Sequence, residues 1–203
     1  MLTLHDNITS GNGYKARLLL ALLKTPYKRI EYDVDVGATR TPEYLARVNA
    51  NGRIPVLQLD DGTCLPESNA ILWYLAEGTP YLPADRLARA QALQWMCFEQ
   101  YSHEPNVATI RYWITHNLEM TPERVAAMPG KRKQGVAALA VMEGHLAKNP
   151  WFAGGAFSIA DIALYAYTHV AEEGGFDLKP YPALRAWLAR IAALPGYIPI
   201  TKG

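Results

Sequence analysis

Two short segments combine residue types that suit the binding of a small charged peptide. In the segment NGRIPVL, residues 51–57, Pro55 stands at the start of an apolar strand. Proline has no backbone N–H, so a cis Ile54–Pro55 bond would turn the backbone of Ile54 toward a ligand instead of a neighbouring strand. Glu67 and Ser68 then open a helical pattern, and supply a carboxylate, a hydroxyl and backbone N–H groups that favour an anion. The two segments predict a receptor for an extended peptide with a free amino-acid end.

The first 80 residues alternate between strand and helix patterns that would position these segments. Strand patterns cover residues 2–5, 29–34, 56–59 and 63–65, and helical patterns cover residues 14–23 and 68–77, with a further short helix starting at Pro42. Thr41 is the expected N-cap of that short helix, and an Asp-Gly pair marks the turn between the last two strands. The order predicts an α/β layer with a mixed sheet.

The segment GTPYLP, residues 78–83, interrupts this pattern, and strand signals disappear after it. Helical patterns follow at residues 86–117, at residues 122–148 with a weaker patch near Pro129, and in a final helix that starts at Pro182. Ser158 and Asp161 form a capping-box-like start for an apolar helix that reaches about Val170, and we expect Asp161 to be a structural cap. We therefore expect domains at residues 1–78 and 86–203, joined by a linker at 79–85.

Composition excludes several classes of partner. The net charge of +1 provides no field for nucleic acid, and no apolar run approaches the roughly 20 residues that span a bilayer. The start of the chain carries no secretory pattern, which favours a cytoplasmic protein. Cys64 and Cys97 have no metal-ligand spacing, so we expect two buried free thiols and no metal.

Four motifs follow one another along the chain: Thr9–Asn12 running into Tyr14–Arg17, Arg53–Pro55, Glu67–Ile71 and Ser158–Asp161. In the order and spacing of these motifs, essentially the whole sequence resembles the cytosolic glutathione S-transferases, of a bacterial, serine-type and zeta- or theta-like kind. The resemblance implies a thioredoxin-like N-terminal domain, an all-helical C-terminal domain, a glutathione site between them and a homodimer.

This resemblance implies chemistry in which the thiol of glutathione must ionise. A free thiol has a pKa of about 8.5, and lowering it by about two units needs roughly 2.7 kcal/mol, which one or two hydrogen bonds to the thiolate supply. Ser10 lies where serine-type members of the family place their hydroxyl, so we expect it to be the main donor. Asn12 is the second candidate and Thr9 the third. The alternative is that Ser10 only caps the helix, although both roles are compatible.

The resemblance also implies how the tripeptide is held. Ile54 would offer its backbone N–H and C=O to the cysteinyl unit, and Glu67 would pair with the γ-glutamyl ammonium. Ser68 and its N–H would receive the adjacent carboxylate, whereas Arg40 and Arg53 would bind the glycyl carboxylate. The alternatives are an ordinary helix cap at Glu67 and Ser68, and plain surface roles for the two arginines.

We expect a small hydrophobic electrophile to lie against the first long helix of the second domain. Tyr101, Asn106 and Tyr112 are the residues expected to face it, although an aromatic stripe is more often part of a core. For His103 and Glu104 we expect a solvated face of the same segment, and the alternative is contact with glutathione across the dimer.

Several functions remain open at this point, including peroxidase and dehalogenase activity. The leading one is conjugation of glutathione to the electrophile, with glutathione as cosubstrate. An isomerase resembling maleylacetoacetate isomerase is weakened, because Ser10-Gly11-Asn12 replaces that group's Ser-Ser-Cys. A binding protein without catalytic activity is the third possibility. Redox exchange through a protein thiol is the fourth, but no cysteine lies near Ser10.

Overall fold

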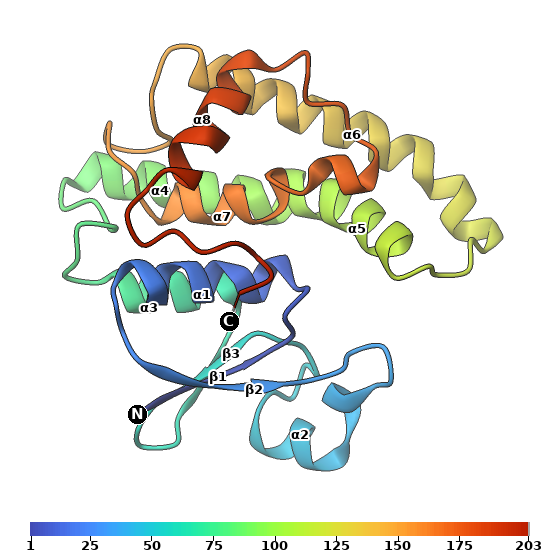
Figure 1. The fold of residues 1–203 in the computed structure, drawn as a ribbon. Coiled ribbons are helices and arrows are strands. Elements are labelled where there is room, and N and C mark those ends of the chain that lie inside the picture. The colour runs from blue at the N-terminus through green and yellow to red at the C-terminus, as the bar shows by residue number, and fades with distance from the viewer. Residues whose placement is uncertain (203) are drawn as a thin grey trace. The chain divides into compact units, whose positions relative to one another are not determined.

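The computed structural model describes residues 1–202 and divides the chain into two compact units (Figure 1). The first unit comprises residues 1–79 together with residues 194–202, and the second comprises Pro80–Ala193. The C-terminal segment therefore belongs with the N-terminal unit, whereas the sequence placed it in a helical domain of residues 86–203.

The first unit is built on a four-stranded mixed sheet in the order β2-β1-β3-β4. Its strands are β1 (Leu2–Asp6), β2 (Tyr27–Glu31), β3 (Val56–Gln58) and β4 (Cys64–Pro66). β1 pairs parallel with β2 and antiparallel with β3, and β3 and β4 form an antiparallel hairpin. The expected mixed sheet and the thioredoxin-like βαβαββα order are both confirmed.

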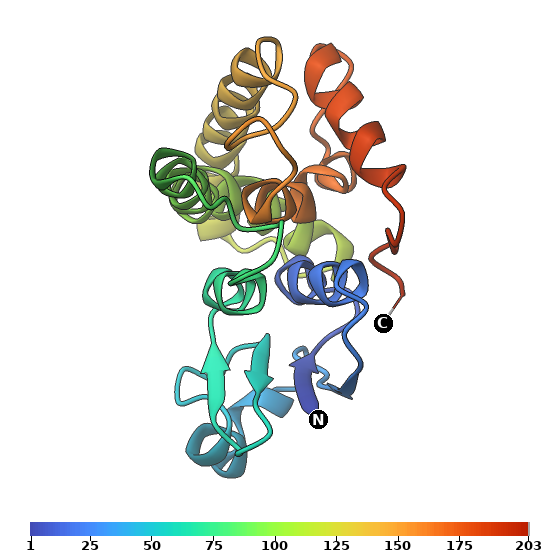
Figure 2. The ribbon, with the colours of Figure 1, turned by 90° about the vertical axis from the view of Figure 1, so that its left-hand side faces the viewer.

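Helices cover both faces of this sheet. They are α1 (Gly11–Leu22), α2 (Pro42–Arg47) and α3 (Ser68–Ala76), with a 3-10 turn, η1, at Ala38–Arg40. Figure 2 shows α1 and α3 side by side on one face, with α2 on the opposite side of the sheet. Leu4 and Leu57 of the strands pack against Ala16, Leu20 and Ile71 of the two helices, so the core fixes the N-terminal ends of α1 and α3 near each other.

The C-terminal segment is held against α1 through backbone carbonyls. The hydroxyl of Tyr14 donates to Ile198 O at 2.7 Å, and Nη1 of Arg17 donates to the carbonyl oxygens of Ile200 and Lys202 at 2.6 and 2.7 Å. Arg17 is fully buried and its guanidinium must find acceptors, which explains why this segment packs with the first unit.

All the long elements of the second unit are helices. These are α4 (Arg86–Phe98), η2 (Glu99–His103), α5 (Glu104–Thr115), α6 (Pro122–Leu146), α7 (Ile159–Thr168), η3 (Ala171–Gly174) and α8 (Pro182–Ala192). All ten residues of α7 are buried, so this helix is the centre of the unit's core. The capping box of Ser158 and Asp161 is present, and Asp161 Oδ1 also accepts from Trp187 Nε1 at 2.9 Å, which confirms its structural role.

The long helix expected at residues 86–117 is interrupted by a turn of π-helix at Glu99–His103. Pro105 has no N–H to donate to the preceding turn, and its ring crowds the carbonyl four residues before it. A π-type turn relieves that crowding by widening the helix, and such turns recur at functional sites.

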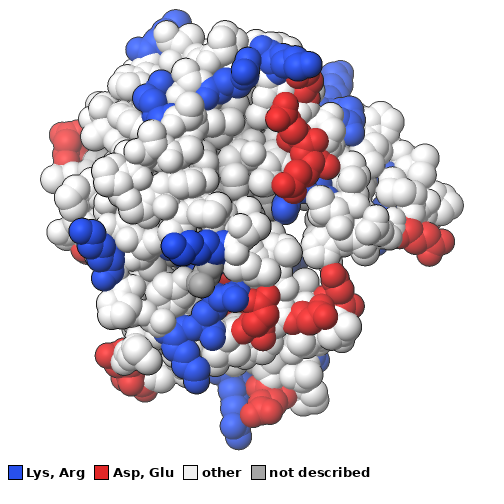
Figure 3. Space-filling view, viewed as in Figure 1, with Lys and Arg blue, Asp and Glu red and all other residues white. Residues whose placement is uncertain are grey.

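The surface carries charges of both signs. On the face shown in Figure 3, basic and acidic side chains are interspersed. Across residues 1–202, none of the helices has the length and apolar character required to cross a membrane. The expected burial of the thiols is wrong for Cys97, which is exposed, while Cys64 is partly buried.

Candidate functional site

Ser10 stands where β1 gives way to α1 and is the N-cap of that helix. Its backbone is extended, with φ −71° and ψ 121°, and its Oγ accepts from the N–H of Gly13 at 3.1 Å. The capping role is therefore present. A hydroxyl that accepts one bond still has its own proton to donate, so the cap and a second role in activating a thiol are compatible.

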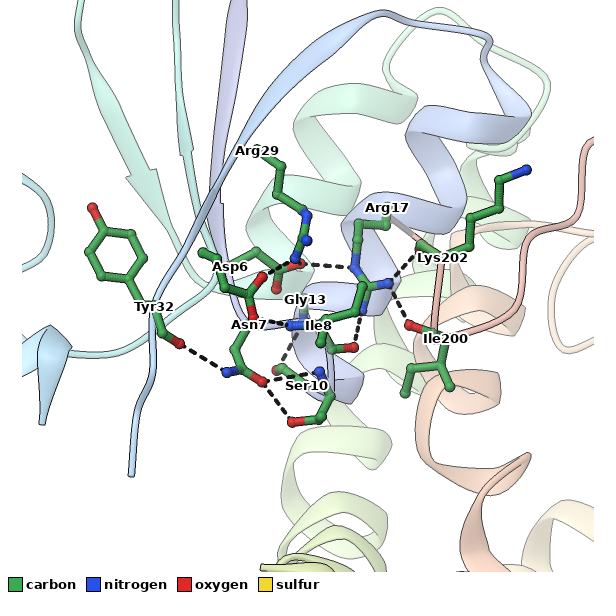
Figure 4. Close-up of polar contacts among 12 residues, drawn as sticks. Asp6, Asn7, Ile8, Ser10, Gly13, Arg17, Arg29, Tyr32, Ile200 and Lys202 are labelled. Carbon is green, nitrogen blue, oxygen red and sulfur yellow. Dashed lines mark hydrogen bonds and ion pairs between the residues drawn. The ribbon is translucent and has the colours of Figure 1, made fainter. Parts of the chain in front are cut away.

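The loop that carries Ser10 is held rigidly by Asn7 (Figure 4). Nδ2 of Asn7 donates to Tyr32 O at 2.9 Å, and its Oδ1 accepts from Thr9 N at 3.0 Å and from Thr9 Oγ1 at 2.6 Å. The N–H of Ser10 donates to Asn7 O at 3.0 Å. These contacts use the Thr9 hydroxyl within the loop, which makes Thr9 a structural residue there.

A buried ion pair lies beneath the same loop. Nε of Arg17 is 2.8 Å from Oδ2 of Asp6, with both side chains fully buried, and Nη2 of Arg17 donates to Ile8 O at 2.8 Å. Burial raises the pKa of Asp6 to about 6, although the guanidinium of Arg17 opposes that shift. Figure 4 shows Arg17 linking Asp6 to the loop and to the C-terminal segment.

The predicted cis peptide bond between Ile54 and Pro55 is confirmed. The turn before it is held by two donors to one carbonyl, since Tyr44 Oη and Asn49 Nδ2 reach Arg53 O at 2.8 and 2.9 Å. The backbone of Ile54 is thereby fixed next to the start of β3, as binding an extended peptide requires.

Glu67 and Ser68 begin α3 with an unusual backbone. Glu67 is the N-cap, with φ 72° and ψ 112°, and its side chain is exposed. A non-glycine residue at positive φ costs about 1–3 kcal/mol, and such strain concentrates at functional sites. Ser68, the first residue of the helix, is buried. No sequence signal revealed this backbone strain.

A hydrogen-bonded chain of side chains joins the N-terminal ends of α1 and α3. Nζ of Lys15 donates to Ser68 Oγ at 3.3 Å, and Ser68 Oγ donates to Asn12 Oδ1 at 3.1 Å. The structure thus brings together two residues predicted for separate roles, Asn12 and Ser68. Sequence reasoning missed Lys15, because a lysine within a helical pattern gives no sign that it is buried.

Arg40 and Arg53 are both exposed side chains on neighbouring turns. Nη1 of Arg40 donates to Asn51 O at 3.0 Å, so this arginine lies along the turn that leads to Ile54. The close approach is possible because residue 52 is glycine, with φ +61°. A Cβ there would lie 2.7 Å from Arg40 Nη1.

In the second unit, a groove of about 490 Å³ separates the α4–η2–α5 segment from α6. Its lining residues are Phe98, Tyr101, Ser102, Asn106, Gln134, Ala137, Ala138 and Val141. Two residues predicted for the second substrate, Tyr101 and Asn106, therefore share one groove. Tyr112 is not part of its lining, and its ring instead lies 4.2 Å from that of His116.

The expected solvated position of His103 is wrong. This side chain is fully buried, and its Nε2 lies 3.0 Å from Oγ1 of Thr168 in α7. Glu99, one turn earlier, is also fully buried, whereas Glu104 is partly exposed. The π-type turn changes the angular register of the helix, so a regular α-helical projection places these residues on the wrong faces.

Two family models match this chain. Residues 1–77 match the glutathione S-transferase N-terminal domain, and residues 123–190 match the glutathione S-transferase C-terminal domain. The chain belongs to the glutathione S-transferase family. The cis Ile54–Pro55 turn and the start of α3 at Ser68 both lie within the matched N-terminal region of this family member.

Three similar proteins illustrate the range within the family. Glutathione S-transferase GstB of Escherichia coli K12 is 32% identical, over 96% of this chain and 95% of that protein. The disulfide-bond oxidoreductase YfcG of the same organism is also 32% identical, over 91% and 87%. A glutathione S-transferase structure from Pseudomonas fluorescens Pf-5 is 48% identical, with a TM-score of 0.94 and 99% of both chains covered.

Proposed function

We propose that this family member is a glutathione transferase that ionises the thiol of bound glutathione and directs it at a small hydrophobic electrophile. The observation that carries the proposal is the hydrogen bond from Ser68 to Asn12, 3.1 Å long. This bond joins Ser68 at the start of α3 to the first turn of α1, which Ser10 caps, and so supports a single site that uses both helix ends. We assign the protein to the serine-type, zeta- or theta-like members of the family.

Glutathione would be bound through its backbone and its charged ends. Ile54 pairs with the cysteinyl unit, Glu67 accepts from the γ-glutamyl ammonium, and the N–H at Ser68 donates to the adjacent carboxylate. Arg40 and Arg53 hold the glycyl carboxylate, since both are exposed and Arg40 lies along the turn before Ile54. A bidentate guanidinium contact would suit that group.

The thiolate would be stabilised by Ser10 and Asn12 at the N-terminal end of α1. The first turn of this helix reads GNGY, so it carries no negative side chain to oppose an anion. A hydrogen bond to a charged sulfur is worth about 1.5–3 kcal/mol, which corresponds to roughly one to two pKa units. Ser10 and Asn12 together can therefore supply the required shift without a general base.

The second substrate would be an apolar electrophile held by the groove that Tyr101 and Asn106 line. The enzyme's remaining contribution is to hold the sulfur and the electrophilic carbon together and to exclude water. We extend the proposal to a cytoplasmic homodimer that uses no metal.

Reduction of disulfides is a second candidate, favoured by the 32% identity to YfcG. The sulfur of glutathione would attack a disulfide, form a mixed disulfide and expel one thiolate. A second glutathione would then release the other thiol and leave as glutathione disulfide. Because no cysteine stands within residues 9–12, this route would use only the sulfur of glutathione, and replacing Cys64 and Cys97 would leave turnover unchanged.

Titration of the bound thiol tests both candidates. We expect thiolate absorbance near 240 nm to give a pKa of about 6.5 in the wild type, about two units below a free thiol. Ser10→Ala and Asn12→Ala should each raise that pKa. An unchanged pKa in both variants would contradict the activation mechanism. Rates with an aryl halide and with a small disulfide then distinguish transfer from reduction.

A further inference from the structure

Lys15 is an unusual residue beneath the proposed site. Its side chain is fully buried in α1, although a lysine is almost never fully buried unless it is paired. Its Nζ donates to Ser68 Oγ at 3.3 Å. Burying an ammonium group is costly, so a lysine retained here calls for an explanation beyond helix packing.

The donor and acceptor rules fix the direction of the chain that starts at Lys15. An ammonium group has donors and no acceptor, so the oxygen of Ser68 accepts from Lys15. The single proton of the Ser68 hydroxyl is then given to Asn12, whose Oδ1 lies 3.1 Å away. The carbonyl end of the Asn12 amide is thus fixed toward Ser68, so Nδ2, which carries both donors, is the end of the amide turned away from Ser68.

We propose that Lys15 is a positioning residue that acts through Ser68 to present the amide donors of Asn12 to the glutathione thiolate. This proposal rests on the function proposed above. Without Lys15, the Ser68 oxygen can accept from Nδ2 of Asn12, and the amide can turn over. The carbonyl oxygen would then face the sulfur, so a donor to the thiolate would be replaced by a repelling acceptor.

The charge of Lys15 acts in the same direction. In the low-dielectric interior, an ammonium beneath two helix N-terminal ends favours anions placed above it. The γ-glutamyl carboxylate and the thiolate are both such anions. Lys15 therefore orients one hydrogen bond of the site and also contributes to the field that stabilises the ionised thiol.

The test measures the bound thiol's pKa at saturating glutathione in Lys15→Met, with Lys28→Met as the matched control. Methionine retains most of the length of the buried stem and removes only the ammonium, while Lys28 is an exposed lysine on β2 of the same unit. We expect Lys15→Met to raise the pKa by about one unit and the control to leave it unchanged, as loss of one hydrogen bond to a charged group predicts. The rate below pH 6.5 should fall about tenfold at saturation.

A double-variant cycle separates positioning from a merely structural role. If Lys15 acts through Asn12, then Lys15→Met combined with Asn12→Ala should raise the pKa by clearly less than the sum of the two single shifts, because only the field of the ammonium adds to the loss of the Asn12 donors. Fully additive shifts would overturn the proposal. So would an unchanged pKa in Lys15→Met.

Ser68→Ala supplies an independent test should Lys15→Met fold poorly. It removes the link between Lys15 and Asn12, and we expect the same rise of about one pKa unit at saturating glutathione. No rise in Ser68→Ala would also overturn the proposal. A wild-type protein that shows no lowered thiol pKa would instead contradict the proposed function itself, so the two failures are distinguishable.

Discussion

At the scale of single residues, the close approach of the backbone at Gly13 to a buried side chain determines which substitutions the start of α1 tolerates. Gly13 lies in the first turn of α1, directly over the buried carboxylate of Asp6. A Cβ at this position would lie 1.6 Å from Oδ1 of Asp6, far inside van der Waals contact. The N–H of Gly13 is also the group that the Ser10 hydroxyl caps. The sequence shows only a glycine between Asn12 and Tyr14, and no local signal reveals the carboxylate beneath it.

We therefore expect Gly13→Ala to lower the free energy of unfolding by about 3 kcal/mol or more, because the methyl group must displace a buried, ion-paired carboxylate. Gly130→Ala is the matched control. It lies inside α6 with open space around its Cβ, so it should raise the free energy of unfolding by roughly 0.5–1 kcal/mol. Urea unfolding of both variants measures the difference. Equal effects would contradict the packing argument.

At the scale of elements, the sequence predicted the features that depend on local patterns. It did not predict the features that depend on contacts with distant parts of the chain. The capping box of α7, the short helix at Pro42 and the hairpin of β3 and β4 have local signatures, and all are present. The π-type turn before Pro105 and the positive φ of Glu67 have none. Lys15 was missed for the same reason, because its burial depends on how α1 packs against α3.

The cap at Asp161 shows that a buried helix cap contributes more to the free energy of unfolding than an exposed one. Its carboxylate accepts from Phe152 N, Ser158 N, Ser158 Oγ and Trp187 Nε1, all of them buried contacts. We expect Asp161→Ala to cost at least 3 kcal/mol, since several buried donors lose their acceptor.

Asp85→Ala is the matched control for this cap, because Asp85 is an exposed N-cap residue whose Oδ1 accepts from Ala88 N at 2.9 Å. Its loss should cost about 1 kcal/mol, the usual value for such a cap. Thermal unfolding of both variants would measure the contrast. Similar losses in the two would show that the buried donors find other partners.

At the scale of the whole molecule, the family match spans both units, yet each unit contains polar contacts of buried or partly buried side chains that composition does not reveal. In the first, Arg17 joins Asp6 to the C-terminal segment. In the second, the ring of His169 stacks on Tyr165 at 4.6 Å, and its Nδ1 donates to Tyr165 O at 2.8 Å. Such groups make global stability depend on pH.

Burial lowers the pKa of His169 to about 4, with the charge of Arg111 acting in the same direction and that of Glu173 opposing it. The unfolded chain binds a proton at this histidine near pH 6.5, whereas the folded protein does not. The stabilising contribution is therefore fully present above pH 6.5 and is lost as the pH falls toward 4. We expect a loss that approaches about 3 kcal/mol, reduced by the partial exposure of the ring.

His169→Phe retains the ring that stacks on Tyr165 and removes the titrating group. The free energy of unfolding of the wild type should therefore fall more steeply than that of the variant between pH 6.5 and 4, while the two curves run parallel above pH 7.5. Urea unfolding at closely spaced pH values measures both. If the curves stayed parallel throughout, the histidine would have to be ionised inside the folded protein, and its neighbours would have to compensate a buried positive charge. The Tyr165 carbonyl and the charge of Glu173 favour the ionised ring, but burial outweighs both, so divergence below pH 6.5 is the outcome that we expect.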